Sequence, residues 1–332
     1  MQQVFAHPLP EPWSSPELVQ DSIVADGLEL HRVGVAARSP AGEEITGAAV
    51  EVGGAPVARG YFELLERIST LEAMAGGAPL PARSRAGGLT GGQSAPSELF
   101  MESEEPHRWR YARSNGVAIH DSWAAACERA HFELVERDRI LSAWYGETRP
   151  SRIALPPGTS FDQLQSYELE AALFPAAPGV TLGEGVVVVG VFGFPQREGL
   201  PFLLGYGGRR TQSEAIEAAI RESLQALGFL WGEALPSERP SLGPTPAAHV
   251  EAMLYPPQHE LIRSWLRDGH ERFARPRVGR QPGDVVFTDL TPHWLTGLFV
   301  AMASSPQARP LAFGDSPFVQ HLPADLRAHP IP

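Results

Sequence analysis

Hydrophobic and polar positions change their spacing repeatedly along the chain, which predicts alternating strands and helices. Apolar, β-branched runs predict strands at 28–35, 43–51, 185–193, 203–206, 284–289 and 298–302. Helical spacing of apolar residues predicts helices at 17–25, 57–75, 123–144, 214–231 and within 256–266. Gly-, Pro- and Ser-rich stretches predict loops at 76–97, at 235–246 and from residue 303 onward. Ser122 and Ser213 are predicted N-caps of the second and third long helices. The interleaving predicts an α+β fold.

One short motif occurs twice, 70 positions apart. Residues 62–67 read Phe-Glu-Leu-Leu-Glu-Arg, and residues 132–137 read Phe-Glu-Leu-Val-Glu-Arg. The polar residues are Glu63, Glu66 and Arg67 in the first copy and Glu133, Glu136 and Arg137 in the second. On a helix the three share one face, with Cβ atoms roughly 5–6 Å apart. Two carboxylates that close repel each other, so the pattern indicates a cation between them.

A third helix repeats the spacing with Glu222 and Gln225, which adds a neutral oxygen. For one isolated copy, a solvated helix face is the ordinary explanation. The duplication and the apolar residues around both copies favour a binding site instead. Mg²⁺ takes about six oxygens and is commonly shared between carboxylates and phosphates. The three helices therefore predict a site for Mg²⁺ and phosphate.

Composition narrows the function classes. The 332 residues are 43% hydrophobic and carry a net charge of −12, which argues against a nucleic-acid-binding surface. The single Cys127 precludes an internal disulfide and fits a reducing cytoplasm. No apolar run is long enough to span a membrane, and the N-terminus has no signal-peptide pattern. We therefore expect a soluble, cytoplasmic protein.

The sequence lacks the motifs that several other kinds of active site require. The sequence contains no lysine, so a Walker-type phosphate loop is excluded. A carboxylate-bridged di-metal bundle needs Glu-x-x-His on two helices, and Glu128 to His131 supplies one. Zinc-ligand spacing and a Gly-x-Ser-x-Gly elbow are absent, and Cys127 lies within a predicted helix, where packing is the simpler role.

In this order, the motifs resemble the YcaO family. The family pattern is a Glu-x-x-Glu-Arg helix, a Ser-Asn-Gly turn before a second such helix, and then Glu-x-x-Gln. The turn corresponds to residues 114–116, and further matches are residues 289–291 and the final His-Pro-Ile-Pro. The resemblance covers essentially the whole chain, so it implies one YcaO-like domain over 1–332, with mixed β-sheets flanked by helices.

The resemblance implies binding of ATP with Mg²⁺ and activation of a peptide amide. A side-chain nucleophile adds to a backbone carbonyl, the oxygen is phosphorylated, and phosphate leaves. Cys, Ser or Thr of a ribosomally synthesised precursor peptide would give thiazoline or oxazoline. The implied Mg²⁺ ligands are Glu63, Glu66, Glu133, Glu136 and Glu222. The implied nucleotide-binding residues are Ser22, Arg67, Asn115, Gln225 and Arg137.

The C-terminal residues are further catalytic candidates under the resemblance. Family cyclodehydratases often end in Pro-x-Pro-x-Pro, which would aim a terminal carboxylate at the reacting amide. This chain has Pro330 and Pro332 but Ala328 at the outer position. Together with Arg137, Pro330 and Pro332 are the expected catalytic residues; a frayed Pro-rich terminus is the alternative.

The resemblance also implies partners. The expected ones are the precursor peptide and a separate E1-like protein that recognises the leader peptide. A flavin-dependent azoline dehydrogenase and a homodimer fit the same pattern. The residues do not distinguish azoline formation from thioamide or amidine formation, because the nucleophile comes from elsewhere. A scaffold that keeps the fold without ATP turnover is the remaining alternative.

Overall fold

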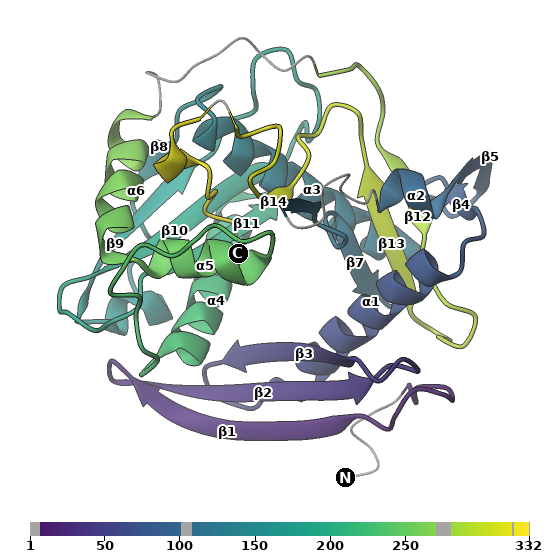
Figure 1. The fold of residues 1–332 in the computed structure, drawn as a ribbon, viewed down its shortest axis with the longest axis horizontal. Helices are drawn as coiled ribbons and strands as arrows, with labels where there is room; N and C mark the ends of the chain where they lie inside the picture. Colours follow the sequence, from purple (N-terminus) through teal and green to yellow (C-terminus); the bar gives the residue numbers. More distant parts are fainter. Residues whose placement is uncertain (1–6, 101–107, 270–279, 321, 332) are drawn as a thin grey trace. The chain divides into compact units, whose positions relative to one another are not determined.

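The computed structural model describes residues 7–100, 108–269, 280–320 and 322–331. The chain divides into two compact units (Figure 1). The first unit comprises residues 1–99, 116–131 and 285–304, and the second comprises residues 100–115, 132–284 and 305–332. Each unit therefore combines segments that are far apart in the sequence. That residues 1–332 form one family domain remains a prediction.

The first unit contains two antiparallel sheets. One has the order β1-β2-β3, formed by β1 (Glu17–Ala25), β2 (Leu28–Arg38) and β3 (Glu44–Glu51). Helix α1 (Val57–Ala75) packs against β2 and β3. The other sheet has the order β5-β4-β12-β13-β7. Its strands are β4 (Leu80–Arg83), β5 (Leu89–Ser94), β7 (Val117–His120), β12 (Val286–Asp289) and β13 (Phe299–Ser304), with the short helix α2 (Pro96–Leu99) following β5.

The second unit is built on a four-stranded antiparallel sheet of order β11-β10-β9-β8. These strands are β8 (Ser151–Ile153), β9 (Tyr167–Leu173), β10 (Val187–Pro195) and β11 (Leu203–Arg209). Helix α4 (Gln212–Leu230) packs on β10 and β11, and α5 (Pro246–Leu254) contacts α6 (Pro256–Asp268). A two-stranded sheet pairs β6 (Trp109–Tyr111) with β14 (Ala312–Gly314). The described residues of the unit also form the 3₁₀ turns η1 (Ser160–Gln163) and η3 (Ala324–Leu326).

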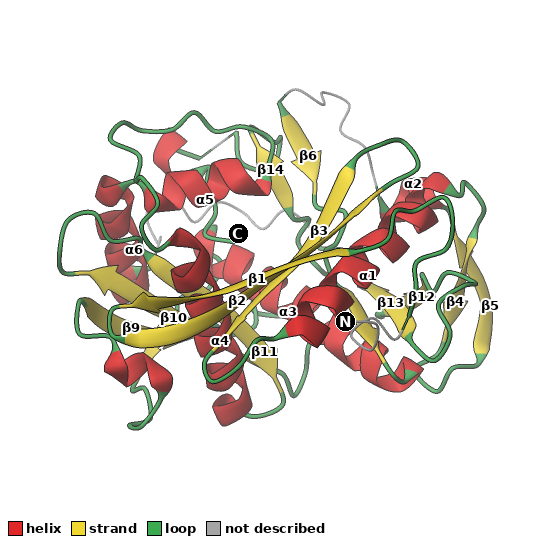
Figure 2. Cartoon of the chain, turned by 90° about the horizontal axis from the view of Figure 1, so that it is seen from below, coloured by secondary structure: helices red, strands yellow, loops and turns green. Residues whose placement is uncertain are grey.

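Helix α3 (Trp123–Trp144) contributes its beginning to the first unit and its end to the second. Its bounds and those of α1 are the predicted ones. The backbone N–H of Ala125 donates to the Ser122 hydroxyl at 3.4 Å, which confirms the predicted N-cap. Figure 2 shows strands and helices mixed throughout the chain, and the α+β prediction is confirmed.

The predicted helix at 17–25 is wrong, because these residues form β1. All nine residues of β1 pair with β2, and the two strands are joined through Asp26 and Gly27. Both turn residues have positive φ, at 47° and 88°, as a two-residue hairpin of type I′ requires. Most of β1 is exposed, so no apolar alternation marks it as a strand. The Asp-Gly pair was the available signal.

Three other predictions are corrected. The predicted loop at 76–97 contains the β4–β5 hairpin, because β4 pairs with the distant β12. The N-cap of α4 is Thr211 rather than Ser213, since Thr211 and Glu214 form a reciprocal capping box. The predicted C-terminal loop contains β14, which pairs with β6. For β4 and β14 the partner strand is distant in sequence, so local composition does not predict the pairing.

Among the described residues, no helix has both the length and the apolar character needed to cross a membrane.

Candidate functional site

Strand β11 holds two of the predicted carboxylates in the second unit. The N–H of Tyr206 donates to Oε2 of Glu222 on α4 at 2.5 Å, and the N–H of Gly208 donates to Oε2 of Glu136 on α3 at 2.7 Å. Residues 206 and 208 alternate along the strand, so their N–H groups point in the same direction. One strand edge thus positions acids from two helices.

The glycines of β11 allow the helices to come this close. A Cβ at Gly205 would overlap the backbone of Ala219 and Ser223 on α4, and a Cβ at Gly207 would overlap the carbonyl oxygen of Ala215. A Cβ at Gly208 would lie 2.7 Å from the carbonyl oxygen of Phe132 on α3. Any larger residue would push a helix, and its carboxylate, away from the strand.

Arg137 is one cation among these acids. Its guanidinium lies 3.8 Å from Oε1 of Glu133 and 3.9 Å from Oε1 of Glu136, both on α3. Burial lowers the pKa of Arg137, but the charges of Glu133, Glu136 and Glu222 together raise it above its ordinary value. Arg137 therefore stays charged. Arg209 adds a second positive charge near Glu136 and Glu222, so among the described residues two cations face three carboxylates and the cluster is short of positive charge.

The shortage of positive charge is reflected in the raised pKa values of the carboxyl groups. Burial raises the pKa of Glu136, against the opposing charges of Arg137 and Arg209. Burial and the charge of Glu136 raise the pKa of Glu222 to about 7. The pKa of the buried Tyr206 is raised well above its ordinary value by burial and by both carboxylates. A bound cation would favour the charged carboxylates and relieve this penalty.

The first unit holds the other copy of the motif in the same way. The N–H of Ala48 on β3 donates to Oε2 of Glu63 at 3.0 Å, and the N–H of Ile119 on β7 donates to Oε2 of Glu66 at 3.2 Å. Arg67 lies 2.6 Å from Oε1 of Glu63. A Cβ at Gly47 of β3 would overlap the α1 backbone. In both units a helical Glu is thus fixed by a strand N–H beside a glycine.

The other predicted residues have different settings. The Ser22 hydroxyl is hydrogen-bonded to Nδ1 of His31 at 2.7 Å in the first unit. Asn115 is half-buried, and its buried Oδ1 has no hydrogen-bond partner among the described residues. Pro330 is buried, whereas Pro332 lies outside the described residues. Cys127 is buried and its pKa is raised to about 12 by burial, so it is packed rather than nucleophilic near neutral pH.

Two residues of the second unit were missed from sequence. The ring of Tyr206 packs against Phe174 and Phe192, and its buried hydroxyl, whose pKa both acids raise, has no hydrogen-bond partner among the described residues. Arg209 lowers the pKa values of Glu136 and Glu222. The run Leu-Gly-Tyr-Gly-Gly-Arg at 204–209 was the available signal, because closely spaced glycines in a strand indicate a close backbone approach.

The arrangement in the second unit fits a nucleotide with Mg²⁺. Carboxylates with raised pKa values, an excess of negative charge and an unpaired buried hydroxyl call for a polar, cationic ligand. No three His, Cys, Asp or Glu side chains among the described residues are grouped closely enough to hold a metal alone. Phosphate oxygens and water commonly complete the coordination of Mg²⁺, so a metal-phosphate complex suits the cluster better than a bare ion.

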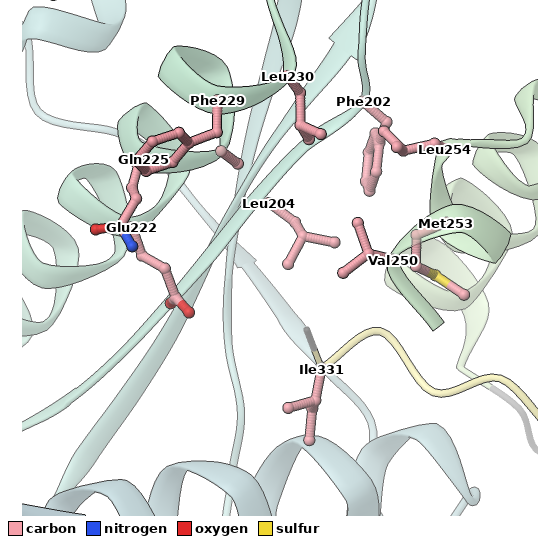
Figure 3. Close-up of a pocket in the computed structure, with 11 residues that line it drawn as sticks. Phe202, Leu204, Glu222, Gln225, Phe229, Leu230, Val250, Met253, Leu254 and Ile331 are labelled. Carbon is pink, nitrogen blue, oxygen red and sulfur yellow. The ribbon is translucent and has the colours of Figure 1, made fainter. Parts of the chain in front are cut away.

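A half-open cavity of about 240 Å³ lies beside the cluster within the second unit. Glu222 and Gln225 belong to its wall, and Figure 3 shows both side chains on α4 with Ile331 across the cavity. The last described residues, 328–331, are buried. The C-terminal segment therefore reaches the cavity that two predicted site residues line, although the predicted role of the Pro332 carboxylate remains a prediction.

A family model described as YcaO cyclodehydratase, ATP- and Mg²⁺-binding, matches residues 89–284. The structure of YcaO from Methanopyrus kandleri bound with AMPPCP and Mg²⁺ is similar, with a TM-score of 0.57 and 17% identity over 95% of this chain and 89% of that one. No curated protein sequence matches significantly.

Two further solved structures share the fold. A heterocyclase in complex with substrate and cofactor has a TM-score of 0.58 at 16% identity; the match covers 95% of this chain but 54% of that one, so this chain spans about half of that protein's length. A chain of the E. coli microcin synthetase McbBCD complex has a TM-score of 0.56 at 10% identity, over 90% of this chain and 89% of that one. At these identities the likeness establishes the fold.

Proposed function

The chain belongs to the YcaO family of ATP- and Mg²⁺-binding proteins, and we propose that it is an ATP-dependent cyclodehydratase acting on a ribosomally synthesised peptide. Cys, Ser or Thr side chains of that peptide become thiazoline or oxazoline rings. The observation that carries the proposal is the anchoring of Glu136 and Glu222 by one strand, with Arg137 among the acids.

The proposed reaction activates a poor leaving group. The side-chain sulfur or oxygen adds to the carbonyl carbon of the preceding residue and loses its proton. The resulting oxyanion takes the γ-phosphoryl group of ATP, and ADP leaves. The amide nitrogen then loses its proton, the C–O bond breaks and phosphate departs as the C=N bond forms. The net change is peptide plus ATP to azoline, ADP and phosphate.

The residues have distinct proposed roles. Glu133, Glu136 and Glu222 would hold Mg²⁺, which when bound offsets the negative charge of the phosphates. Arg137 steadies these acids and, with Asn115 and Gln225, would bind phosphate oxygens through charge-assisted and neutral hydrogen bonds.

In the first unit, Glu63 and Glu66 remain predicted Mg²⁺ ligands and Arg67 and Ser22 predicted nucleotide ligands. The repeated hexapeptide supports Glu63, Glu66 and Arg67, and the resemblance supports Ser22.

Partners are part of the proposal. A precursor peptide supplies the reacting amide, and an E1-like protein delivers it by recognising its leader. The similarity in fold to a chain of the microcin synthetase McbBCD complex and to a heterocyclase in complex with substrate supports both.

The test follows the amide oxygen. A peptide that the protein modifies is synthesised with ¹⁸O in the backbone carbonyl preceding the reacting Cys, and the phosphate released with ADP is analysed by mass spectrometry. We expect one ¹⁸O atom in phosphate for each ring formed. We also expect Glu222→Gln to lower the rate by about 10²–10³-fold, and the exposed Glu217→Gln on the same helix to leave it unchanged. Label that appears in water, or stays in the peptide as rings form, would exclude phosphorylation of the amide.

A further inference from the structure

The cavity beside Glu222 is mainly apolar. Its wall comes from β11 and the residue before it, from α4, α5 and the C-terminal segment: Phe202, Leu204, Glu222, Gln225, Ala226, Phe229, Leu230, Val250, Met253, Leu254 and Ile331. Figure 3 shows the apolar side chains facing one another across the cavity, with Glu222 and Gln225 on one side. All of these residues belong to the second unit. An open apolar cavity in contact with a catalytic cluster indicates a ligand with both polar and apolar parts.

The face of α4 toward the cavity changes in polarity along the helix. Its residues are 222, 225, 226, 229 and 230, at i, i+3, i+4, i+7 and i+8, which is one helical face. Glu222 begins this face, Gln225 follows, and Phe229 and Leu230 end it. With a rise of 1.5 Å per residue, Glu222 and Phe229 are roughly 10 Å apart along the helix axis. The cavity thus changes from acidic to apolar within two turns of α4, with Leu204 and Ala226 among its apolar residues.

The exposure of Phe229 indicates an incomplete surface. Its side chain is 37% exposed, whereas Met253 and Leu254 on the facing helix are 3% and 7% exposed. A large aromatic ring at the edge of a half-open apolar cavity is a common feature of binding sites. An apolar group that entered the cavity would remove this surface from water.

The size of the cavity limits its occupant. At about 240 Å³ it exceeds the ~150 Å³ cavity that accommodates benzene, and it is below the ~300–1,000 Å³ of pockets for drug-sized ligands. A bulky apolar side chain therefore fits in the cavity. An adenine ring would need partners for its amino group and ring nitrogens, and the described wall offers polar side chains only at Glu222 and Gln225.

We propose that this cavity binds the apolar side chain of the peptide residue whose carbonyl is activated, the residue immediately before the cyclised Cys, Ser or Thr. The inference rests on the proposed function, because it takes the phosphorylated carbonyl to lie near Glu222. It adds a substrate preference: a large apolar residue at this position, with small or polar residues disfavoured.

Met253 provides a direct readout of cavity occupancy. The chain has five methionines, and among the described residues Met253 is the one in the cavity wall. The protein is labelled with ¹³C in its methionine methyl groups, and the Met253 signal is assigned with Met253→Leu. After saturation with AMPPCP and Mg²⁺, it is titrated with acetyl-Leu-Cys-Gly-amide and with the isosteric acetyl-Asn-Cys-Gly-amide. We expect the Leu peptide to shift the Met253 signal with saturation, at concentrations at least ~10-fold below those the Asn peptide requires.

Two variants that fill the cavity test its location. Ala226→Phe on α4 and Val250→Phe on α5 place a ring in the cavity from two different walls, and each should abolish the Met253 shift. Ala247→Phe is the matched control, because Ala247 is exposed on α5 and outside the wall, and it should keep the shift. Equal behaviour of the two peptides, no Met253 shift, or a shift that survives both filling variants would overturn the inference.

Two further measurements distinguish this inference from binding of the base and from failure of the proposed function. They are the effect of AMPPCP alone on the Met253 signal, and the release of ADP when a peptide is added. A Met253 shift on addition of AMPPCP, with nucleotide binding lost in both filling variants, would assign the cavity to the base and overturn the inference. Ring formation without a preference for Leu over Asn would also overturn it while the proposed function stands. A Leu-selective shift without ADP release from either peptide would support the cavity's preference and count against the proposed function.

Discussion

The acidic residues of the second unit outnumber the cationic side chains that lie near them in the described part of the chain. Arg137 faces Glu133, Glu136 and Glu222, and Arg209 adds a second favourable charge for Glu136 and Glu222. Burial nevertheless raises the pKa of both of these carboxyl groups. A site of this kind carries a cost in the free protein that its ligand relieves. Activity and stability therefore make opposite demands on the same side chains.

Glu222→Gln should reveal this cost in metal-free protein. The pKa of Glu222 is raised from 4.5 to about 7, so the folded state holds its proton more tightly than the unfolded state does. Its contribution to the free energy of unfolding is greatest below pH 4.5, falls as the pH rises toward 7, and is constant above that. Relative to the variant, the wild type should lose up to about 1.4 kcal/mol per pH unit over this range.

Urea unfolding of both proteins at pH 5, 6, 7 and 8, without Mg²⁺ or nucleotide, measures the difference. Glu217→Gln on the exposed side of α4 is the control and should show no such pH dependence. A constant difference between wild type and Glu222→Gln across the range would show that Glu222 has an ordinary pKa.

At the residue scale, the sequence predicts the acids better than their neighbours. The duplicated hexapeptide and Glu222 stand out because like charges at helical spacing need an explanation. Tyr206 does not, since a tyrosine in an apolar strand has an ordinary packing role. The influence of Glu136 and Glu222 on Tyr206 depends on which helices cover β11, and no local pattern in the strand gives that information.

At the scale of elements, close approach of strand and helix sets the carboxylates. Gly205 and Gly207 on β11 face the backbone of α4, and Gly47 on β3 faces that of α1. In each case a strand N–H then reaches a helical carboxylate. Strand glycines are ordinarily unfavourable, because they add flexibility and bury no side chain. Here they shorten the distance that a Glu side chain must span.

Gly207→Ala should lower both stability and nucleotide binding. The added Cβ would overlap the carbonyl oxygen of Ala215, so α4 must shift and Glu222 with it. We expect a loss of about 1–3 kcal/mol in the free energy of unfolding and weaker binding of AMPPCP with Mg²⁺. Gly34→Ala on β2 is the matched control, since a Cβ there meets nothing within 4 Å and should change stability by less than about 0.5 kcal/mol. Equal effects of the two substitutions on unfolding would contradict this role for Gly207.

The C-terminal segment is fixed to β14 by two buried histidines. Nε2 of His249 on α5 accepts from the N–H of Gly314 at 3.0 Å, and Nε2 of His329 donates to the carbonyl oxygen of Ala312 at 3.0 Å. Their ring centroids are 4.3 Å apart. Burial lowers the pKa of His249 to about 4 and that of His329 well below its ordinary value. Both rings are therefore neutral in the folded protein near pH 7.

His249→Gln should weaken the dependence of stability on acid. A histidine with a lowered folded pKa contributes full stability above its ordinary pKa of 6.5, and this is lost as the pH falls toward about 4. The Gln amide can still accept from Gly314 but does not titrate. Between pH 6.5 and 4.5, the wild type should lose up to about 1.4 kcal/mol per pH unit more than the variant. Thermal unfolding at several pH values tests this, with the exposed His293→Gln as the control. Parallel curves for wild type and His249→Gln would contradict it.

Whether a helix or strand was predicted correctly depends on how local its sequence pattern is. The bounds of helices α1 and α3 agree with the prediction, because each is a long run of residues that favour helix and has no internal proline. Strand β1 was taken for a helix because most of its residues are exposed, and β4 and β14 were missed because their partners β12 and β6 are remote in sequence. Pairing between distant segments supplies what local composition lacks.

At the scale of the whole molecule, the order of motifs identifies the family. The two Glu-x-x-Glu-Arg helices, the turn at 114–116 and the Glu-x-x-Gln helix were sufficient for the resemblance, and the family model confirms it over residues 89–284. The composition of the two compact units was not predicted. Residues 285–304 join the first unit because β12 and β13 complete the sheet of β4 and β7. Such long-range pairing follows from the assembled sheet rather than from any one segment.

Calorimetric titration with AMPPCP, with and without Mg²⁺, is the measurement closest to the proposed role of the acids. Wild type and Glu217→Gln should bind AMPPCP with equal affinity and only when Mg²⁺ is present. Glu136→Gln and Glu222→Gln should each weaken that binding by about 10–100-fold or more while remaining folded. Binding that does not depend on Mg²⁺, or that is unchanged in both variants, would contradict a metal-nucleotide site built on α3, α4 and β11.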